Sequence, residues 1–230
     1  MDTTLNKVGA FEIKDLKTGI LFDESEGMYP SRAYGYVGIN ASNIIIGDIP
    51  NTTFGLVTED DITIEYSGKQ FGPLSKGHYF SIPGVFEIFG LGSAVMFERI
   101  GFRGVFGIGG PVENRGRVEY IDGCSDSILT YPPRLGDPIS NILWFPKNTT
   151  QTMHTHPTLR FGFVFSGNGE CLTPEGKGRL DSGKVFFLKE MGKHCFNTYD
   201  ETMSIFTFHP DSDWGPTDDN HPMLNRTHIK

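Results

Sequence analysis

The sequence of 230 residues has few cysteines and no cysteine motif. Cys124, Cys171 and Cys195 are widely spaced, odd in number and form no C-x-x-C pair. This pattern argues against a disulfide framework and against a zinc knuckle. We therefore expect three buried or idle thiols, with a special interest in Cys195 because it directly follows His194.

Basic clusters and long apolar runs are also missing. The chain has 20 basic and 28 acidic residues and a net charge of −8, which makes it a poor candidate for binding nucleic acid or an anionic membrane. No apolar run approaches the roughly 20 residues that a membrane-spanning helix requires, and residues 1–15 lack the apolar core of a signal peptide. We expect a cytoplasmic protein that acts on a small molecule, with neither nucleic acid nor membrane as partner.

Helical periodicity is hard to find as well. The chain is instead rich in turn formers and aromatic residues, with 29 glycines, 14 prolines and 19 phenylalanines, which suits short strands. Its short apolar runs are bounded by Gly, Pro, Asn or Asp, as strands in a sandwich or barrel are. These features predict an all-β fold. The predicted strands cover residues 44–46, 62–66, 78–82, 94–97, 161–165, 185–188 and 204–208.

A weak internal repeat divides the chain into two similar halves. A strand with a glycine turn, a glycine with a second strand, and a closing strand occur in this order over 61–102 and again over 160–210. The stretch between the copies is rich in Pro, Gly and Asp, which is typical of a linker. The predicted organisation is an N-terminal domain over 1–121, a linker over 122–138, and a C-terminal domain over 139–230 whose tail, anchored by Trp214, wraps the domain or a partner subunit.

His154 and His156 form the first candidate site. On a β-strand, residues i and i+2 point to the same face, so two imidazoles at this spacing can chelate one ion. Such a pair alone is usually a surface accident. The residues that follow favour a metal site, because Arg160, Gly167 and His194 continue the spacing of a known pair of motifs.

This spacing resembles the two cupin motifs, G-x5-H-x-H-x3-4-E-x6-G and G-x5-P-x-G-x2-H-x3-N. His154, His156 and His194 fall on the three histidine positions, and Gly167 and Gly183 fall on the turn glycines. Together with the repeat, the resemblance is to a bicupin. It implies two cupin-like double-stranded β-helix (jelly-roll) barrels in tandem, with one metal site in the C-terminal barrel.

The sequence departs from the cupin pattern at several positions. Asn148 replaces the first Gly, Lys189 and Met191 replace the Pro and Gly of the second motif, and Asn197 stands one position early. Arg160 occupies the position of the carboxylate ligand. Because a guanidinium cannot bind a cation, the resemblance implies a site of three histidines, like those of cysteine dioxygenase and the gentisate-type ring-cleaving dioxygenases.

The first copy of the repeat lacks the histidines of the second. Gly55 and Val57 fall where an H-x-H pair would stand, Ile88 falls at the third histidine position, and only Asp61 keeps the carboxylate position. We therefore expect the N-terminal domain to carry no metal ligands. His78 lies off the ligand positions and is interpreted as structural.

Three neutral imidazoles bind Fe(II), Ni, Mn or Zn and leave up to three coordination positions open. We expect one divalent ion, with iron as the first candidate. Arg160 is a candidate catalytic and substrate-binding residue, because it could pair with a carboxylate or enolate. The alternatives are hydrogen bonds to backbone carbonyls or a salt bridge to Asp200 or Glu201. His209 is a candidate general acid or base, with a rim position as the competing interpretation.

Phe196 and Asn197 are further candidate substrate-binding residues because they follow His194 directly. For Phe196 and the other phenylalanines of this half, burial in the core is the competing interpretation.

Three functions fit these residues. The first is an Fe(II)-type dioxygenase acting on a small anionic or enolisable substrate. The second is a metal-dependent lyase, isomerase or epimerase acting on a small acid or sugar acid. The third is a cupin that binds a small ligand without catalysis. Cupins often pair through sheet edges, so a homodimer is a further expectation from the resemblance.

Overall fold

The computed structural model describes residues 7–40, 43–134 and 136–211. Within these ranges the chain forms strands and two short 3-10 helices, η1 (Gly38–Asn40) and η2 (Ile121–Gly123), without an α-helix, so the all-β prediction is confirmed. Each predicted strand overlaps an observed one, but the strand predicted over 161–165 runs on to Thr173. The described part of the chain has no helix that is long and apolar enough to cross a membrane. The expected anchor Trp214 lies outside the described residues.

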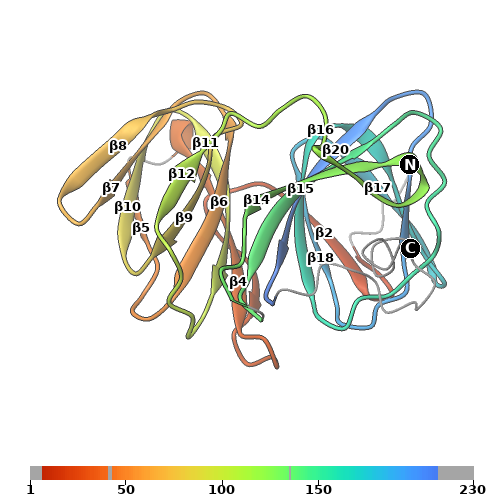
Figure 1. Cartoon of the computed structure of the whole chain (residues 1–230), viewed down its shortest axis with the longest axis horizontal. Helices are drawn as coiled ribbons and strands as arrows, with labels where there is room; N and C mark the ends of the chain where they lie inside the picture. Colours follow the sequence, from red (N-terminus) through yellow and green to blue (C-terminus); the bar gives the residue numbers. More distant parts are fainter. Residues whose placement is uncertain (1–6, 41–42, 135, 212–230) are drawn as a thin grey trace, which may run out of the picture. The chain divides into compact units, whose positions relative to one another are not determined.

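The chain divides into two compact units. Unit 1 joins Met1–Asp15 to Arg115–Lys230, and unit 2 is Leu16–Asn114. These boundaries differ from the predicted ones, because the first strands of the chain join the C-terminal sheet and a strand runs through the predicted linker (Figure 1). The physical reason is burial: Phe11, in the first part of the chain, is fully buried and its ring lies 5.2 Å from that of Phe186.

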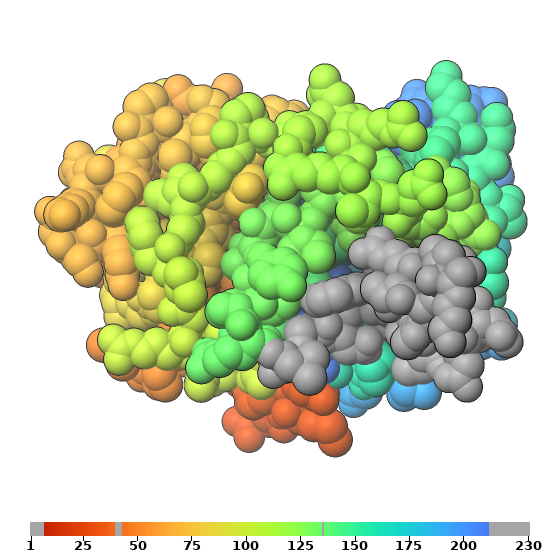
Figure 2. Space-filling view, viewed as in Figure 1, coloured from red at the N-terminus to blue at the C-terminus, as the bar shows by residue number. Residues whose placement is uncertain are grey.

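Within its described residues, unit 2 has a four-stranded sheet in the order β5-β10-β7-β8 and a six-stranded sheet in the order β12-β9-β6-β11-β4-β3. Most of β8 is exposed, and the β7–β8 hairpin, in orange, lies at the surface (Figure 2). Its strands are β3 (Gly19–Glu24), β4 (Ser31–Val37), β5 (Asn43–Ile46), β6 (Thr52–Glu59), β7 (Ile62–Tyr66), β8 (Lys69–Leu74), β9 (Tyr79–Pro83), β10 (Phe86–Gly90), β11 (Ser93–Arg99) and β12 (Gly107–Gly109).

Within its described residues, unit 1 is built on a sheet with the path β1-β2-β18-β16-β20-β15-β14-β13, and β17 and β19 pair with β16 off this path. Its strands are β1 (Lys7–Val8), β2 (Phe11–Asp15), β13 (Val118–Glu119), β14 (Ser125–Thr130), β15 (Ile139–Phe145), β16 (Arg160–Thr173), β17 (Gly176–Asp181), β18 (Lys184–Leu188), β19 (Cys195–Asn197) and β20 (Met203–His209).

The long strand β16 organises unit 1. Its first half pairs with β18 on one side and β20 on the other, and its second half pairs with β17 and β19. Gly162, in the first half, has the ring of Phe186 where a Cβ would stand, since that position lies 2.1 Å from the ring. Only glycine therefore lets β18 fold its phenylalanine over β16 at this point.

Unit 2 repeats this pairing. β6 lies between β9 and β11, β11 lies between β6 and β4, and β10 pairs with β7. Gly55 on β6 faces the ring of Phe80 on β9, again with a Cβ position 2.1 Å from the ring. The sequence repeat therefore corresponds to a repeated strand pairing.

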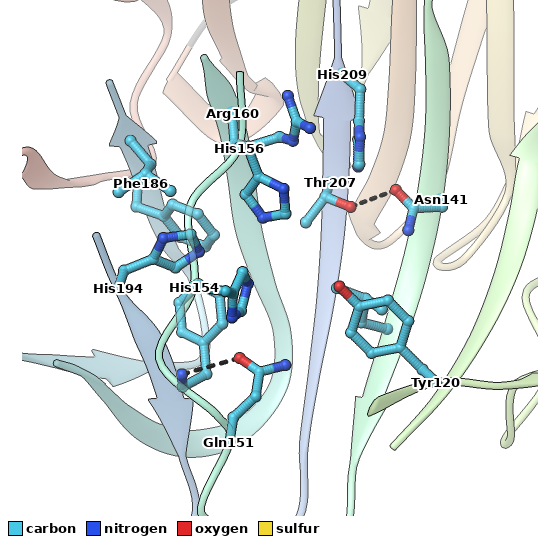
Figure 3. A pocket seen from close by; sticks show the side chains of 13 residues that line it. Tyr120, Asn141, Gln151, His154, His156, Arg160, Phe186, His194, Thr207 and His209 are labelled. Carbon is cyan, nitrogen blue, oxygen red and sulfur yellow. Dashed lines mark hydrogen bonds between the residues drawn. The ribbon is translucent and has the colours of Figure 1, made fainter. Parts of the chain in front are cut away.

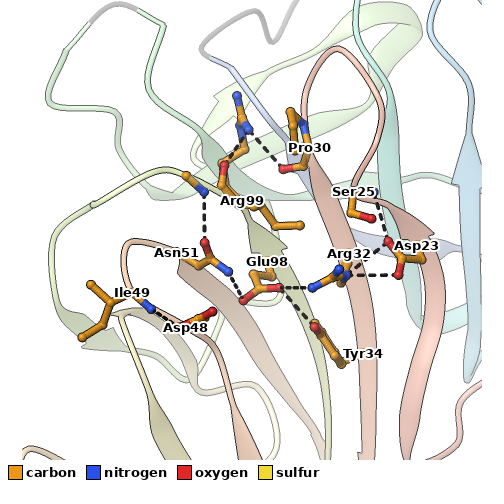
Figure 4. A network of polar contacts seen from close by, with 12 residues as sticks. Asp23, Ser25, Pro30, Arg32, Tyr34, Asp48, Ile49, Asn51, Glu98 and Arg99 are labelled. Carbon is orange, nitrogen blue, oxygen red and sulfur yellow. Dashed lines mark hydrogen bonds and ion pairs between the residues drawn. The ribbon is translucent and has the colours of Figure 1, made fainter.

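A buried carboxylate, Glu98, stands at the end of β11 in unit 2 (Figure 4). It accepts hydrogen bonds from Asn51 Nδ2 at 2.8 Å and from Tyr34 Oη at 3.1 Å. Arg32 Nη1 lies 3.9 Å from Glu98 Oε2, and Arg32 Nε donates to Asp23 at 3.1 Å. Burial and the neighbouring Glu98 raise the pKa of Tyr34 to about 12, so its hydroxyl remains a donor.

Candidate metal centre

Three buried histidines of unit 1 converge. His154, His156 and His194 each offer one ring nitrogen, and these nitrogens lie within 4.8 Å of one another. The ring centroids are 4.9 Å apart for His154 and His156, 4.6 Å for His154 and His194, and 5.2 Å for His156 and His194. The structure therefore brings together the three histidines that the cupin resemblance implied (Figure 3).

Backbone hydrogen bonds hold this arrangement. His154 and His194 exchange two N–H···O=C bonds of 2.9 Å as an isolated antiparallel bridge. The carbonyl of His156 accepts from the N–H of Met191 at 2.8 Å. The expectation that the H-x-H pair lies on a strand needs correction, since His154 makes only this bridge and His156 lies in no strand. The two side chains still face the same way, because the segment is tied to the chain around His194.

The ring orientation of two ligands is set by backbone carbonyls. His154 Nδ1 lies 2.7 Å from the carbonyl of Thr152, and His194 Nδ1 lies 2.9 Å from the carbonyl of Gly192. Because a carbonyl only accepts, each Nδ1 carries the hydrogen and each Nε2 keeps its lone pair. This is the arrangement in which metal-binding histidines are usually held.

The three imidazoles are poised in the neutral form. Burial lowers the pKa of His154, and burial together with the positive charge of Arg160 holds the pKa of His156 well below its usual range. For His194, burial is again the main cause and the neighbouring His154 adds to it. Only neutral imidazole can bind a metal ion, so these shifts favour ligation at neutral pH.

These donors fit a divalent transition metal. Metal–imidazole bonds are roughly 2.0–2.1 Å long, and three nitrogens within 4.8 Å of one another can reach one ion with small ring movements. Three neutral imidazoles leave coordination positions open for a ligand. When bound, such an ion supplies a Lewis-acidic centre and a place where two ligands can meet.

Arg160 is buried beside the histidines, at the start of β16. Its Nη1 donates to the carbonyls of Thr158 at 3.1 Å and Leu159 at 2.9 Å, and also to the Thr158 hydroxyl. One of the expected alternatives, bonding to backbone carbonyls, is therefore present. The guanidinium also lines the cavity at the histidines, where it places a positive charge next to any bound ligand.

The cavity is small. Its volume is about 30 Å³, which is room for roughly two waters, since one water needs about 10–15 Å³. As it stands, the cavity has room for an ion and about one further ligand atom. It is lined by Tyr120, Asn141, Leu143, Gln151, His154, His156, Arg160, Phe186, Leu188, His194, Phe196, Thr207 and His209.

The cavity lining places the other expected site residues. His209 is buried with its ring centroid 6.4 Å from that of His156, so it lies in the cavity wall. Phe196 both lines the cavity and packs in the core, with its ring 5.4 Å from His194 and 5.8 Å from Phe145. Asn197 is buried but does not line the cavity, and its side-chain oxygen faces Cys195 Sγ instead. All three cysteines are free and buried, as expected.

Four polar residues of the wall were not expected: Tyr120, Asn141, Gln151 and Thr207. Thr207 could have been found because it stands two residues before His209 on one strand. Asn141 is a polar residue within the otherwise largely apolar strand β15. Tyr120 carries no signal, because it lies in the part of the chain assigned to the N-terminal domain. Burial raises the pKa of Tyr120 above its ordinary range, so its phenol stays protonated.

The repeated pairing shows what unit 2 has in place of the histidines. The β7–β8 and β16–β17 hairpins both close with a two-residue turn, and matching these turns aligns the residues of the two units. Phe86 then takes the place of His194, and its strand partner Ile46 takes that of His154. Ile88, expected at the histidine position, corresponds to Phe196 instead. Both phenylalanine and isoleucine offer no ligand atom.

The comparisons with known proteins give the fold. No family model matches the sequence, and no curated protein matches it. Among solved structures, a cupin 2 conserved barrel domain protein from Leptotrichia buccalis matches with a TM-score of 0.59 at 13% identity, over 86% of this chain and 88% of that one. The fold is that of a cupin.

Two further structures have the same fold. Protein Ylba from E. coli, of family model DUF861, matches with a TM-score of 0.61 at 19% identity, over 93% of this chain and 96% of that one. A salicylate 1,2-dioxygenase from Pseudaminobacter salicylatoxidans matches with a TM-score of 0.61 at 9% identity, over 90% and 86% of the two chains. At these identities the likeness concerns the fold, and function must be argued from the site.

Proposed function

We propose that this cupin is a metal-dependent enzyme, an Fe(II)-type dioxygenase that acts on a small anionic or enolisable substrate. The observation that carries the proposal is the convergence of three neutral imidazoles, two of them held by Nδ1 bonds to backbone carbonyls. Such a ligand set leaves open positions at the ion, which oxygen chemistry requires. A dioxygenase among the structures of the same fold is consistent with this proposal.

The charge around the site supports an anionic substrate. The three ligands are neutral, so the ion would keep its double positive charge. Arg160 adds a further positive charge in the same cavity. The small volume of the cavity limits the substrate to a few atoms inside it. A larger substrate would require the cavity wall to open.

The test begins with the metal. The protein, purified without a histidine tag, is stripped with a chelator and loaded separately with Fe(II), Ni(II), Mn(II) and Zn(II). Oxygen consumption is then followed with panels of diketones, thiols and diphenols. We expect oxygen uptake with iron only, and its loss in His194→Ala.

Other outcomes would replace the proposal. Substrate turnover without oxygen uptake, supported by zinc or manganese, would show a lyase or isomerase that uses the ion as a Lewis acid. A protein that holds no metal after any loading would be a ligand-binding cupin without this chemistry. Each of these results would overturn the proposal of a dioxygenase.

A further inference from the structure

A chain of three buried polar residues ends at the cavity wall. Asp126 on β14, Asn141 on β15 and Thr207 on β20 are at most 5% exposed. Asn141 Nδ2 donates to Asp126 Oδ1 at 3.0 Å. The Thr207 hydroxyl donates to Asn141 Oδ1 (Figure 3). Asn141 and Thr207 both line the cavity, so the chain connects a buried carboxylate to the ligand space.

The direction of these hydrogen bonds follows from Asp126. A carboxylate accepts and does not donate, so the amide of Asn141 must turn its nitrogen toward Asp126 and its oxygen toward Thr207. The single hydrogen of the Thr207 hydroxyl is then committed to Asn141. What Thr207 can still offer is an acceptor lone pair.

The opposite polarity is found at Gln151. Its Oε1 accepts the backbone N–H of Phe196 at 3.1 Å, which leaves the Nε2 hydrogens as the donors of that side chain. Gln151 and Thr207 therefore present a donor and an acceptor to the same cavity.

The fold itself does not require a hydroxyl at this position of the strand. In unit 2 the corresponding residue of β11 is Met96, which pairs with Gly55 as Thr207 pairs with Gly162. Met96 is fully buried and packs in the apolar core. A polar side chain in such a place is costly unless it is hydrogen-bonded. Thr207 is hydrogen-bonded to Asn141, whereas the equivalent position of unit 2 needs no polar side chain. The polar chain that ends at the cavity therefore points to a ligand-directed role for the Thr207 oxygen.

We propose that Thr207 is a specificity-determining residue that selects ligands carrying a hydroxyl or amino hydrogen toward β20. This inference rests on the proposed function, because it assumes that the ligand is a small anion held at the metal. An anion that carries such a donor, for example a hydroxy acid, would bind the metal at the histidines through its carboxylate and donate its hydroxyl hydrogen to Thr207 on β20.

The test uses the Co(II)-loaded full chain and four probes: glycolate, fluoroacetate, 3-hydroxypropionate and 3-fluoropropionate. Fluorine replaces the hydroxyl at similar size but has no hydrogen to donate. Dissociation constants are measured from the cobalt absorption bands for the wild type, Thr207→Val and Thr207→Ser. Thr53→Val makes the same substitution at a buried position of unit 2 and serves as the matched control.

We expect at least one hydroxy acid to bind more tightly than its fluoro partner. In Thr207→Val this preference should fall by about fivefold to tenfold, the range of one net hydrogen bond. Thr207→Ser and Thr53→Val should keep it. If Thr207→Val does not fold, Thr207→Ala takes its place in the same comparison.

Several results would overturn the inference. An unchanged preference in the metal-loaded Thr207→Val protein, or a wild type that binds none of the four acids, would remove Thr207 from ligand selection while the metal centre stands. A wild-type chain that holds no metal would overturn the proposed function, and this inference with it.

Discussion

At the scale of single residues, the candidate site consists of three imidazoles, each with one ring nitrogen within 4.8 Å of the others. Each of the three histidines is buried, and two are oriented by backbone carbonyls two residues earlier in the chain. Few other side chains of the cavity could replace a missing histidine as a metal ligand. Apart from Arg160 and His209, they offer mainly amide, hydroxyl, aromatic and aliphatic groups. Metal affinity is therefore the property most sensitive to these residues.

His154→Ala, His156→Ala and His194→Ala should each reduce the bound metal to near zero while the fold survives. The reason is that two protein ligands are too few to hold a divalent ion, whereas the core is built from apolar side chains. Metal per chain is measured by elemental analysis, and folding by circular dichroism. His78→Ala, in unit 2, is the matched control and should retain one ion per chain. Stoichiometric metal in one of the three variants would exclude that residue as a ligand.

Arg160→Lys should lower kcat/KM by roughly tenfold to a hundredfold, because lysine keeps the charge but loses the planar fork of donors. Metal content should hardly change, since arginine gives the ion no bond. Arg160→Glu should tighten metal binding and weaken an anionic ligand. Steady-state kinetics and metal titration measure the two effects separately. Unaltered turnover and ligand affinity in Arg160→Ala would show that the residue serves only its bonds to Thr158 and Leu159.

At the scale of elements, the centre of unit 1 is the contact of β16 with β18. Gly162 lets the ring of Phe186 lie directly on β16, and Phe186 in turn lines the cavity at the three histidines. The equivalent contact in unit 2, between Gly55 and Phe80, has no ligand histidine beside it. Substitutions at these two glycines therefore distinguish a loss of folding stability, expected in both units, from a loss of metal affinity, expected in unit 1 alone.

Gly162→Ala should destabilise the protein by about 1–3 kcal/mol, because the added methyl group meets the Phe186 ring and forces it to move. The same shift should weaken metal binding. Gly55→Ala should have a similar effect on stability and leave metal affinity unchanged. Gly107→Ala, where the added carbon meets nothing within 4 Å, should stay within about 0.5 kcal/mol of the wild type. Urea unfolding and metal titration provide the measurements, and equal loss of metal affinity in Gly55→Ala would contradict this assignment.

At the scale of the whole molecule, the chain is two compact units of which one carries the three histidines. A ligand that binds only the folded state stabilises that state. Bound metal should therefore stabilise the strands of unit 1. Amide exchange, which is measured strand by strand, should distinguish unit 1 from unit 2.

Metal removal should raise amide exchange in β16, β18 and β20 and leave β6, β9 and β11 nearly unchanged. The reason is that the ion ties together chain segments of unit 1 only. Hydrogen–deuterium exchange of the loaded and stripped protein, followed by mass spectrometry of peptides, measures this. Equal changes in both sets of strands would show that the two units respond to the metal as one.

The stripped protein should lose stability as the pH falls below about 6.5, the ordinary histidine pKa. The three ligand histidines have folded-state pKa values below that of the unfolded chain. The unfolded chain therefore binds more protons in this window, and the free energy of unfolding decreases with acidification. Above about pH 6.5 this contribution is fully present. Urea unfolding at a series of pH values tests it, and His194→Gln should flatten the slope; an equal slope in both proteins would contradict the assignment.

Local patterns in the sequence determined the class of fold and pointed to the three histidines that converge. Short apolar runs between turn formers specify strands because alternating burial needs only neighbouring residues. The spacing of His154, His156 and His194 indicated one site through its resemblance to the two cupin motifs. The repeat is visible in the sequence because each copy is a local series of strands and turns.

Tertiary structure alone decided which distant residues complete the site. β2 joins β18 across 169 residues of sequence, as the contact of Asp15 with Lys184 shows, and no local pattern encodes that pairing. Tyr120, Asn141 and Thr207 come from separate segments, and their meeting depends on sheet order. The register of unit 2 likewise put Phe86, and not Ile88, at the third ligand position. Which residues face one cavity is a property of how strands pair, and pairing is settled only by burying the core as a whole.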